Sequence, residues 1–258
     1  MLQRNPNSHK GDNGKVMVIG GNEMFHGAPL LAALAAEQAG ADLVYLWLPS
    51  CHAQVARTYS LNLIVHTFQE THLSPADVKT LLHFAEQTDV VVIGPGLGSH
   101  PDTQKAIKTF LTELQVPAVV DASALLRITQ FPKGSVLTPH RGEFTALTGE
   151  EPEPAHVQKW AKEFGVTIVC KGPKDIISDG KDVALNETGN ALMSVGGTGD
   201  ALAGFIGGLM AQHVPAFEAA ELATRLWGLA GDERAKTHAS LRAEDLLPII
   251  PEMLFKNA

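Results

Sequence analysis

The chain has 258 residues, of which 45% are hydrophobic and 19% are charged, so it is long enough for one large α/β domain and short for two. Its net charge of −8 argues against a nucleic-acid or anionic-membrane partner, since either would require a basic surface. No apolar run approaches the roughly 20 residues that span a bilayer, and the polar start of the chain is unlike a signal peptide. Two widely separated cysteines indicate ordinary thiols in a reducing compartment. We therefore expect a single cytoplasmic domain over residues 1–258.

Short apolar runs alternate with longer helical patterns along the chain. Strands are expected over residues 16–19, 43–47, 90–93, 118–120, 136–137 and 167–170. Helices that begin at prolines are expected over 29–39, 75–86, 101–114 and 154–164. Residues 176–185 predict a hairpin that turns at Asp179-Gly180, as an edge ribbon without a catalytic part, and the chain after Asp200 is predicted to be nearly all helical. The alternation predicts an α/β fold with a mainly parallel central sheet and helices on both faces.

Five of the predicted strands end in glycine-rich or short polar turns. These turns are Gly20-Gly21, Gly94–Gly98, Asp121–Ser123, Thr138–Glu143 and Lys171-Gly172. Any one of them could be a simple tight connection, but ligands of open α/β sheets collect at the carboxyl ends of the strands, so five together predict a crevice. The fingerprints of P-loop enzymes and Rossmann dehydrogenases are missing from the chain, which disfavours both classes.

The segment from Ser194 to Asp200 combines three glycines, a predicted helix start and one carboxylate. Gly196, Gly197 and Gly199 permit unusual backbone angles, so several N–H groups can converge there, and the helix adds the positive end of its dipole. The pattern favours a phosphate site in which Asp200 is a base or a metal-linked group. The alternative is that Asp200 only caps the helix.

Further motifs occur in order from about residue 9 to residue 245. They are His9-Lys-Gly11, Gly27-Ala-Pro29, Gly94-Pro-Gly-Leu-Gly98, Thr138-Pro-His140 with Gly142-Glu-Phe144, Lys171-Gly172, Thr188-Gly-Asn190 and Gly196-Gly-Thr-Gly-Asp200. Together they resemble the ADP/ATP-dependent NAD(P)H-hydrate dehydratases of the ribokinase-like superfamily. The last motif alone is shared with several ribokinase-like kinases, whereas the joint occurrence is much more specific. The resemblance implies a ribokinase-like fold, in a chain with no room for the epimerase domain of the bifunctional members.

The resemblance also implies a reaction that repairs hydrated nicotinamide cofactors. Members of the family remove water from the S form of NADH or NADPH hydrate (NADHX, NADPHX), using Mg²⁺ and a nucleotide, for which ADP is expected ahead of ATP. The ring hydroxyl is phosphorylated and phosphate is then eliminated. In this chain Asp200 would be the base, and the backbone N–H groups of Gly197 to Gly199 would cradle the phosphoryl group.

The family's binding residues can be carried over position by position. The substrate side would comprise Ala28, Gly96, Gly98, His140 and Asp200, and the nucleotide side Lys171, Gly172, Pro173, Lys174, Asp175, Gly197, Thr198 and Gly199. Glu143 would hold Mg²⁺ through water, although a helix-start carboxylate accounts for it equally well. Arg141 replaces the family's usual proline, and Pro173-Lys174 replaces smaller residues, which leaves open which of these side chains meets the nucleotide. The resemblance further suggests a homotetramer.

Two other classes of function remain open at this point. One is a ribokinase-like kinase that acts on a hydroxymethyl-pyrimidine, a thiazole or a sugar alcohol, with Asp200 again as the base. The other is a non-catalytic nucleotide-binding protein, against which the intact Asp200 and Gly197 to Gly199 argue.

Overall fold

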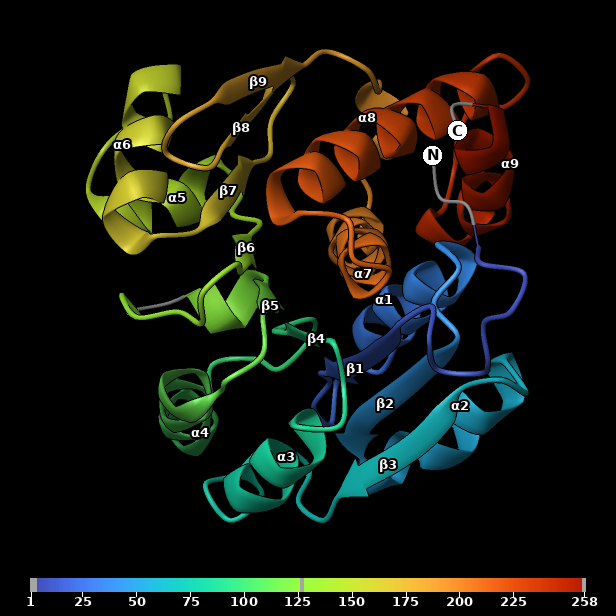
Figure 1. The fold of residues 1–258 in the computed structure, drawn as a ribbon, viewed down its shortest axis with the longest axis vertical. Helices are drawn as coiled ribbons and strands as arrows, with labels where there is room; N and C mark the ends of the chain where they lie inside the picture. Colours follow the sequence, from blue (N-terminus) through green and yellow to red (C-terminus); the bar gives the residue numbers. More distant parts are fainter. Residues whose placement is uncertain (1–3, 126–127, 257–258) are drawn as a thin grey trace.

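The computed structural model describes residues 4–125 and 128–256, and in this part of the chain nine strands form one sheet. The strand order is β3-β2-β1-β4-β5-β6-β7-β8-β9 (Figure 1). The strands are β1 (Lys15–Ile19), β2 (Leu43–Pro49), β3 (Ile64–Phe68), β4 (Val90–Ile93), β5 (Ala118–Val120), β6 (Val136–Leu137), β7 (Thr167–Cys170), β8 (Asp175–Ser178) and β9 (Val183–Asn186). All neighbouring strands from β3 to β7 pair in parallel. Strand β8 pairs antiparallel with both β7 and β9. The sheet is therefore mainly parallel, as the sequence predicts.

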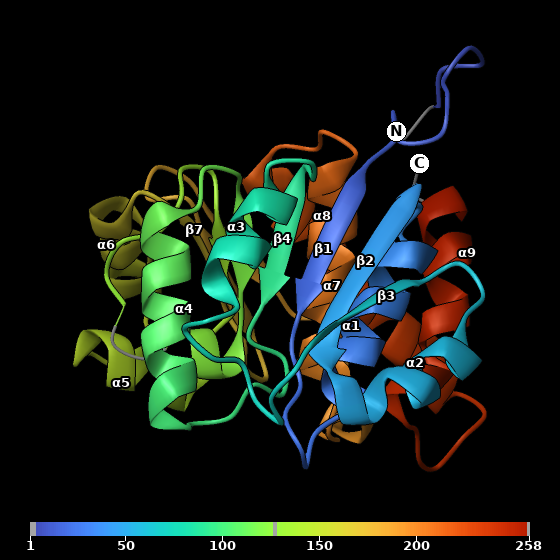
Figure 2. The same cartoon turned by 90° about the horizontal axis from the view of Figure 1, so that it is seen from below.

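Helices cover both faces of the sheet. They are α1 (Gly27–Gln38), α2 (Ala53–Tyr59), α3 (Val78–Ala85), α4 (Pro101–Glu113), α5 (Arg141–Thr148), α6 (Pro154–Phe164), α7 (Thr198–Ala211), α8 (Ala216–Ala235) and α9 (Ile250–Lys256). Figure 2 shows α3 and α4 in front of the sheet and α7 and α8 behind it. Strand β1 is buried on both sides because Val16 and Val18 pack with α1 and α7, while Met17 and Ile19 pack with the core under α3 and α4.

The six predicted strands and the hairpin are confirmed, with bounds that differ by at most two residues. Pro101 and Pro154 begin α4 and α6, but Pro29 is the third residue of α1, and α3 begins only at Val78, three residues after Pro75. Strand β3 and the short helix α2 were missed, and α5 was foreseen only as the helix-start alternative for Glu143. Strand β3 interrupts its apolar residues with His66 and Thr67 and pairs only with β2, so it lacks the continuous apolar run of a central strand.

Two features of this fold position the residues at the strand ends. Strands β1, β4, β5, β6 and β7 are parallel neighbours, so their carboxyl ends meet along one edge. Helix α7 brings its first turn to the same edge because it packs at backbone distance on α1: a β-carbon at Gly204 would lie 1.9 Å from the carbonyl oxygen of Ala32. No helix in the described residues is both long and apolar enough to cross a membrane.

Candidate active site

A cavity of about 820 Å³ opens at the edge where the strands end. One side is formed by His140, Lys171 and Gly172, which follow β6 and β7. The other sides are formed by the segment of residues 188–195 and by side chains of α7 and α8, including Leu202 and Trp227. A volume of this size is in the range of small-molecule and nucleotide sites.

A buried ion pair lies beside this cavity. Lys171 Nζ lies 2.8 Å from Asp121 Oδ1, and the same oxygen accepts a hydrogen bond of 2.7 Å from the Thr138 hydroxyl. Burial disfavours the charged form of Lys171, but Asp121, together with the charges of Glu143 and Asp200, outweighs it and raises the pKa of the lysine. A β-carbon at Gly199 would lie 3.1 Å from Lys171 Nζ, so the ammonium group rests against the first turn of α7. Asp121 thereby holds a positive charge where phosphate is expected.

Asp200 is the third residue of α7, at the same helix start. The N-cap of the helix is Gly197, so Asp200 lies inside the first turn and the capping alternative for it is wrong. Burial raises the pKa of Asp200 to about 6, and repulsion from Asp121 and Glu143 adds to this effect while Lys171 opposes it. A carboxylate with a pKa near neutrality is suited to general-base catalysis.

The three glycines before Asp200 differ from one another. Gly197 has a φ of 97°, in the left-handed region, and a β-carbon there would lie 2.4 Å from Leu31 Cδ1. Gly196 and Gly199 have ordinary backbone angles. The expectation that all three provide unusual backbone angles is therefore correct only for Gly197, which turns the chain into α7.

His140 and Glu143 form a capping box at the start of α5. The His140 N–H donates to Glu143 Oε2 at 2.8 Å, and the Glu143 N–H donates to His140 Nδ1 at 3.1 Å. Because Nδ1 accepts this bond, a neutral His140 carries its proton on Nε2, which lies 3.5 Å from Glu143 Oε1 at the wall of the cavity. Glu143 is thus the helix-start carboxylate that the sequence allowed. Arg141 pairs with Glu151 at 3.6 Å.

The small residues of the predicted substrate side lie together: Ala28 follows β1, and Gly96 and Gly98 follow β4 beside the end of β5. A β-carbon at Gly96 would lie 3.1 Å from that of Ala28, and the N–H of Gly98 donates to the Ser123 hydroxyl at 3.0 Å. The fit depends on Gly94, where a β-carbon would lie 1.8 Å from the carbonyl oxygen of Asp121. The residues Ala28, Gly96 and Gly98 are not part of the cavity wall. The structure therefore groups them with one another and places His140 with the residues of the nucleotide side.

Six of the eight residues predicted for the nucleotide side line the cavity. They are Lys171, Gly172, Pro173, Asp175, Thr198 and Gly199. Lys174 instead pairs with Glu187 at 2.5 Å, and Gly197 is the helix N-cap. Asp175, the first residue of the hairpin, accepts hydrogen bonds from the N–H of Gly172 and the side chain of Asn186, and burial raises its pKa. The hairpin lies at the sheet edge as expected, and it also contributes this wall residue.

Several residues of the site were not predicted. Asp232 on α8 accepts hydrogen bonds from the N–H of Gly189 and the side chain of Asn190, at 2.9 and 3.0 Å, and so holds the segment that closes the cavity. The Thr188-Gly-Asn190 motif was a signal for this segment, but α8 carries no motif of its own. Asp121 stood in one of the five predicted turns at the strand ends, yet its pairing with a lysine fifty residues further on leaves no trace in the spacing.

The fold and the site define a ribokinase-like enzyme. The structure matches that of a ribokinase-like superfamily protein from Enterococcus faecalis with a TM-score of 0.90 and 30% identity, covering 99% of this chain and 92% of that one. Residues 16–252 match the family model described as NAD(P)H-hydrate dehydratase, and the chain belongs to this family.

Two similar proteins carry more specific names. The chain is 36% identical to the ADP-dependent (S)-NAD(P)H-hydrate dehydratase of Cenarchaeum symbiosum, over 97% of this chain and 92% of that protein. The ADP/ATP-dependent NAD(P)H-hydrate dehydratase from Bacillus subtilis, co-crystallized with ATP/Mg²⁺, matches with a TM-score of 0.86 and 26% identity, covering 99% of this chain and 94% of that one. The chain spans about half the length of the bifunctional NAD(P)H-hydrate repair enzymes that it also matches. These findings confirm the predicted fold and family, and they favour the dehydratase over the small-molecule kinase.

Proposed function

We propose that the chain catalyses the nucleotide-dependent dehydration of the S form of NADH or NADPH hydrate, which regenerates the reduced cofactor. The observation that carries the proposal is the Asp200 carboxylate at the start of α7, with a pKa raised to about 6 and Lys171 against the same helical turn. The names of the two relatives, one ADP-dependent and one ADP/ATP-dependent, support ADP or ATP as the co-substrate.

The chemistry follows from a poor leaving group. Hydroxide does not leave the ring readily, whereas phosphate does. In the proposed mechanism Asp200 accepts the proton of the ring hydroxyl, and the hydroxyl oxygen attacks the terminal phosphoryl group of the nucleotide. The N–H groups of Thr198 and Gly199 and the ammonium of Lys171 stabilise the negative charge that develops on this group. The bond between this phosphoryl group and the bridging oxygen of the nucleotide breaks, and ADP or AMP leaves. The C–O bond of the ring phosphate then breaks and phosphate departs with the bonding electrons. Solvent water takes a proton from the neighbouring ring carbon, which restores the ring double bond.

The two ligands are assigned to the two groups of residues at the strand ends. The nucleotide occupies the cavity at Lys171, Gly172, Pro173, Asp175, Thr198 and Gly199, with Lys174 and Gly197 beside it. The nicotinamide hydrate lies at Ala28, Gly96 and Gly98, and His140 binds its phosphates from the cavity side. Asp200, which follows the cavity residues Thr198 and Gly199 in α7 without lining the cavity itself, is assigned a place between the two groups, because the transferred phosphoryl must reach the ring hydroxyl.

The family also implies Mg²⁺, and the residues present fit it in one way. Oε2 of Glu143 accepts a hydrogen bond from the N–H of His140, and Oε1 lies 3.5 Å from His140 Nε2. This arrangement suits contact with a metal-bound water better than direct coordination, and Mg²⁺ in proteins keeps several waters. When bound, the ion would neutralise charge on the nucleotide phosphates.

We further propose that residues 1–258 form one domain, which acts in the cytoplasm as a homotetramer. One continuous sheet with a core on each face supports the single domain. Two free thiols, Cys51 and Cys170, are consistent with a reducing compartment. The tetramer rests on the family resemblance and is tested by light scattering of the purified chain.

The decisive experiment supplies the S hydrate of NADH or NADPH, Mg²⁺ and either ADP or ATP to the purified protein. We expect the absorbance of the reduced nicotinamide to return and one phosphate to be released for each cofactor repaired. The R hydrate is the control and should remain unchanged. A stable phosphorylated hydrate without recovery of absorbance would instead identify a kinase, and no turnover with either nucleotide would contradict the proposal.

A further inference from the structure

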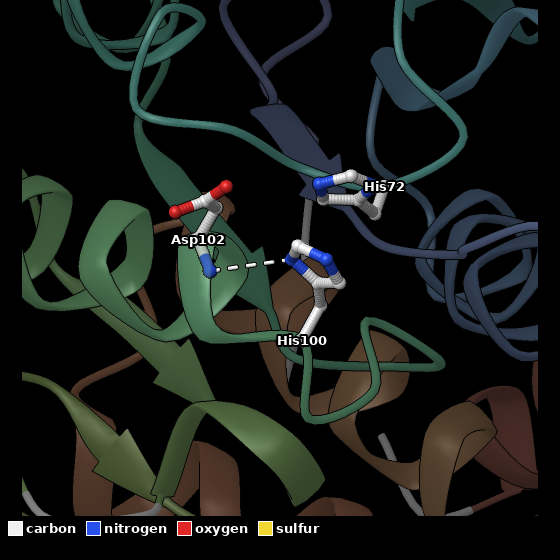
Figure 3. A group of neighbouring side chains, drawn as sticks. All are labelled: His72, His100 and Asp102. Atoms are coloured by element: carbon white, nitrogen blue, oxygen red, sulfur yellow. Dashed lines mark hydrogen bonds between the residues drawn. The ribbon is translucent and has the colours of Figure 1, made fainter.

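Two histidines and an aspartate meet outside the site described above (Figure 3). His72 comes from the connection between β3 and α3, whereas His100 and Asp102 stand at the start of α4. One metal-binding atom from each of the three side chains lies within 4.8 Å of the other two, and the centroids of the histidine rings are 3.9 Å apart. Within residues 4–125 and 128–256 no other group of three His, Cys, Asp or Glu residues meets this condition.

The backbone under these side chains is held in place by a buried hydrogen bond. The hydroxyl of Thr103, the residue after Asp102, donates to the carbonyl of Leu73, the residue after His72, at 2.8 Å. Both residues are fully buried, so this bond ties the two chain segments together independently of any ligand. Only side-chain rotation is then needed to bring the three groups onto a common centre.

We propose that His72, His100 and Asp102 bind one transition-metal ion of the Zn²⁺ type. Imidazole nitrogens suit zinc and nickel, whereas Mg²⁺ prefers oxygen ligands throughout, so this site is separate in chemistry from the magnesium of the reaction. Zinc binds its ligands at about 2.0–2.1 Å in a tetrahedral arrangement, which places neighbouring ligand atoms about 3.4 Å apart. The three groups therefore have to close by only a short distance, and water completes the fourth position.

Two existing interactions compete with the metal. His100 Nδ1 accepts a long hydrogen bond of 3.2 Å from the Asp102 N–H, so coordination through this nitrogen replaces a helix cap. Lys105 Nζ lies 3.1 Å from Asp102 Oδ1, but this ion pair is exposed, and such pairs contribute little to stability. The second carboxylate oxygen of Asp102 is free to coordinate. Both competitors are thus weak.

The test measures metal binding directly and needs no hydrate, so its outcome is independent of the proposed repair activity. The metal-free full-length chain is titrated with ZnCl₂ by calorimetry, with MgCl₂ in a parallel titration. Three variants are compared with it: His72→Ala, Asp102→Asn and the control His83→Ala. Asp102→Asn retains the backbone N–H that donates to the His100 cap of α4 but loses the charge, and His83 is an exposed histidine on α3.

We expect one zinc ion to bind per chain, with at least about tenfold weaker binding for His72→Ala and Asp102→Asn and unchanged binding for His83→Ala. Zinc should also raise the unfolding temperature of the unaltered chain but not that of the double variant His72→Ala/Asp102→Asn. Absence of zinc binding, or equal binding by the chain and the double variant, would overturn the proposal. Because Asp102→Asn leaves the cap and the buried Thr103 bond intact, it keeps the test valid if His72→Ala is unstable.

Discussion

The two sides of the candidate site consist of different kinds of residues. The cavity side presents charged side chains, with Lys171 held by Asp121 against the helix that carries Asp200. The side at Ala28 and Gly96 has no charged side chain of its own among the residues assigned to it, and its shape comes from close backbone approach. Charge therefore stands where a phosphoryl group is to be transferred, and small residues stand where a flat ring is to be bound.

This difference predicts that changes on the two sides alter different measured quantities. On the cavity side, substitutions should change turnover, nucleotide affinity and pH dependence. On the side formed by Ala28, Gly96 and Gly98, which we call the glycine side, substitutions should change the Michaelis constant of the hydrate and little else.

The largest effect is expected for Asp200→Asn. The change preserves size but removes the base, so turnover should fall by about 10²–10⁴-fold. Nucleotide affinity should remain, because the N–H groups of Thr198 and Gly199 are untouched. The measurement is steady-state turnover of the hydrate beside calorimetric titration of ADP. Near-normal turnover would refute the assignment of Asp200.

The same variant should be more stable than the unaltered protein at pH 8. The pKa of Asp200 is raised from 3.8 to about 6 on folding, so this carboxylate lowers stability progressively as the pH rises from about 3.8 to about 6, and the loss is complete above that pH. An asparagine side chain carries no such cost, and we expect about 1–3 kcal/mol of added stability at pH 8, shrinking as the pH falls toward 4. Urea unfolding at the two pH values checks the sign. A gain that is equal at both would contradict the raised pKa.

A matched pair of substitutions tests the separation of the two sides. Gly199→Val places a side chain against Lys171 Nζ and should weaken nucleotide binding about tenfold, with the hydrate KM unchanged. Ala28→Leu fills the space beside Gly96 and should raise the hydrate KM about tenfold, with nucleotide affinity unchanged. Calorimetry with ADP and steady-state kinetics provide the two readouts. If both variants alter both quantities equally, the two sides are not separate.

Two further substitutions should move the pH profile in opposite directions. Lys171 favours the ionised form of Asp200, so Lys171→Met should raise the pKa of the base and shift the acid limb of kcat up by about one pH unit. Asp121 and Glu143 disfavour the ionised form, so Asp121→Asn should shift that limb downward. Both variants break a buried pair and need a check of folding by circular dichroism. Shifts of the same sign would show that the charges do not act on Asp200.

The smallest effect is expected at His140. Replacing it with alanine removes both the cap of α5 and the Nε2 donor, which should cost about 1 kcal/mol of stability and raise the KM of the hydrate about 2–10-fold. His140→Asn keeps a capping oxygen, so it should recover the stability but not the KM. Thermal unfolding and kinetics of the two variants separate the roles. A normal KM in the His140→Asn variant would show that His140 caps α5 but does not bind the hydrate.

Patterns that are local in the sequence were enough to predict most of the fold. Continuous apolar runs identified the central strands because those strands are covered on both faces. Strand β3 escaped this criterion because His66 interrupts it, and α5 escaped because only Phe144 of its eight residues is buried. A short helix with a single buried residue has no periodicity to detect.

The parts of the site that lie within a single short segment of the sequence were predictable. The glycines at the ends of β4 and before α7 stand in short motifs, and so does Asp200. The pairing of Asp121 with Lys171 was not predictable, because it arises from the order β5-β6-β7 in the sheet. The division of the predicted substrate residues between the cavity and the glycine side also depends on three-dimensional position, which a resemblance of motifs does not contain.

The contact between α1 and α7 has a consequence for motion. Gly204 and Gly208 of α7 lie against the backbone of Ala32 and Ala36 on α1. Asp200 stands in the first turn of α7, and Ala28 stands in the first turn of α1. Helices in backbone contact cannot slide past each other without unpacking, so the base and the ring-binding residue should move as one rigid body during turnover. We expect any closing over bound nucleotide to come from the segment of residues 188–195, which hydrogen bonds attach to α8 and to the Thr198 hydroxyl. Hydrogen exchange should accordingly be slow in α1 and α7 and fast in that segment.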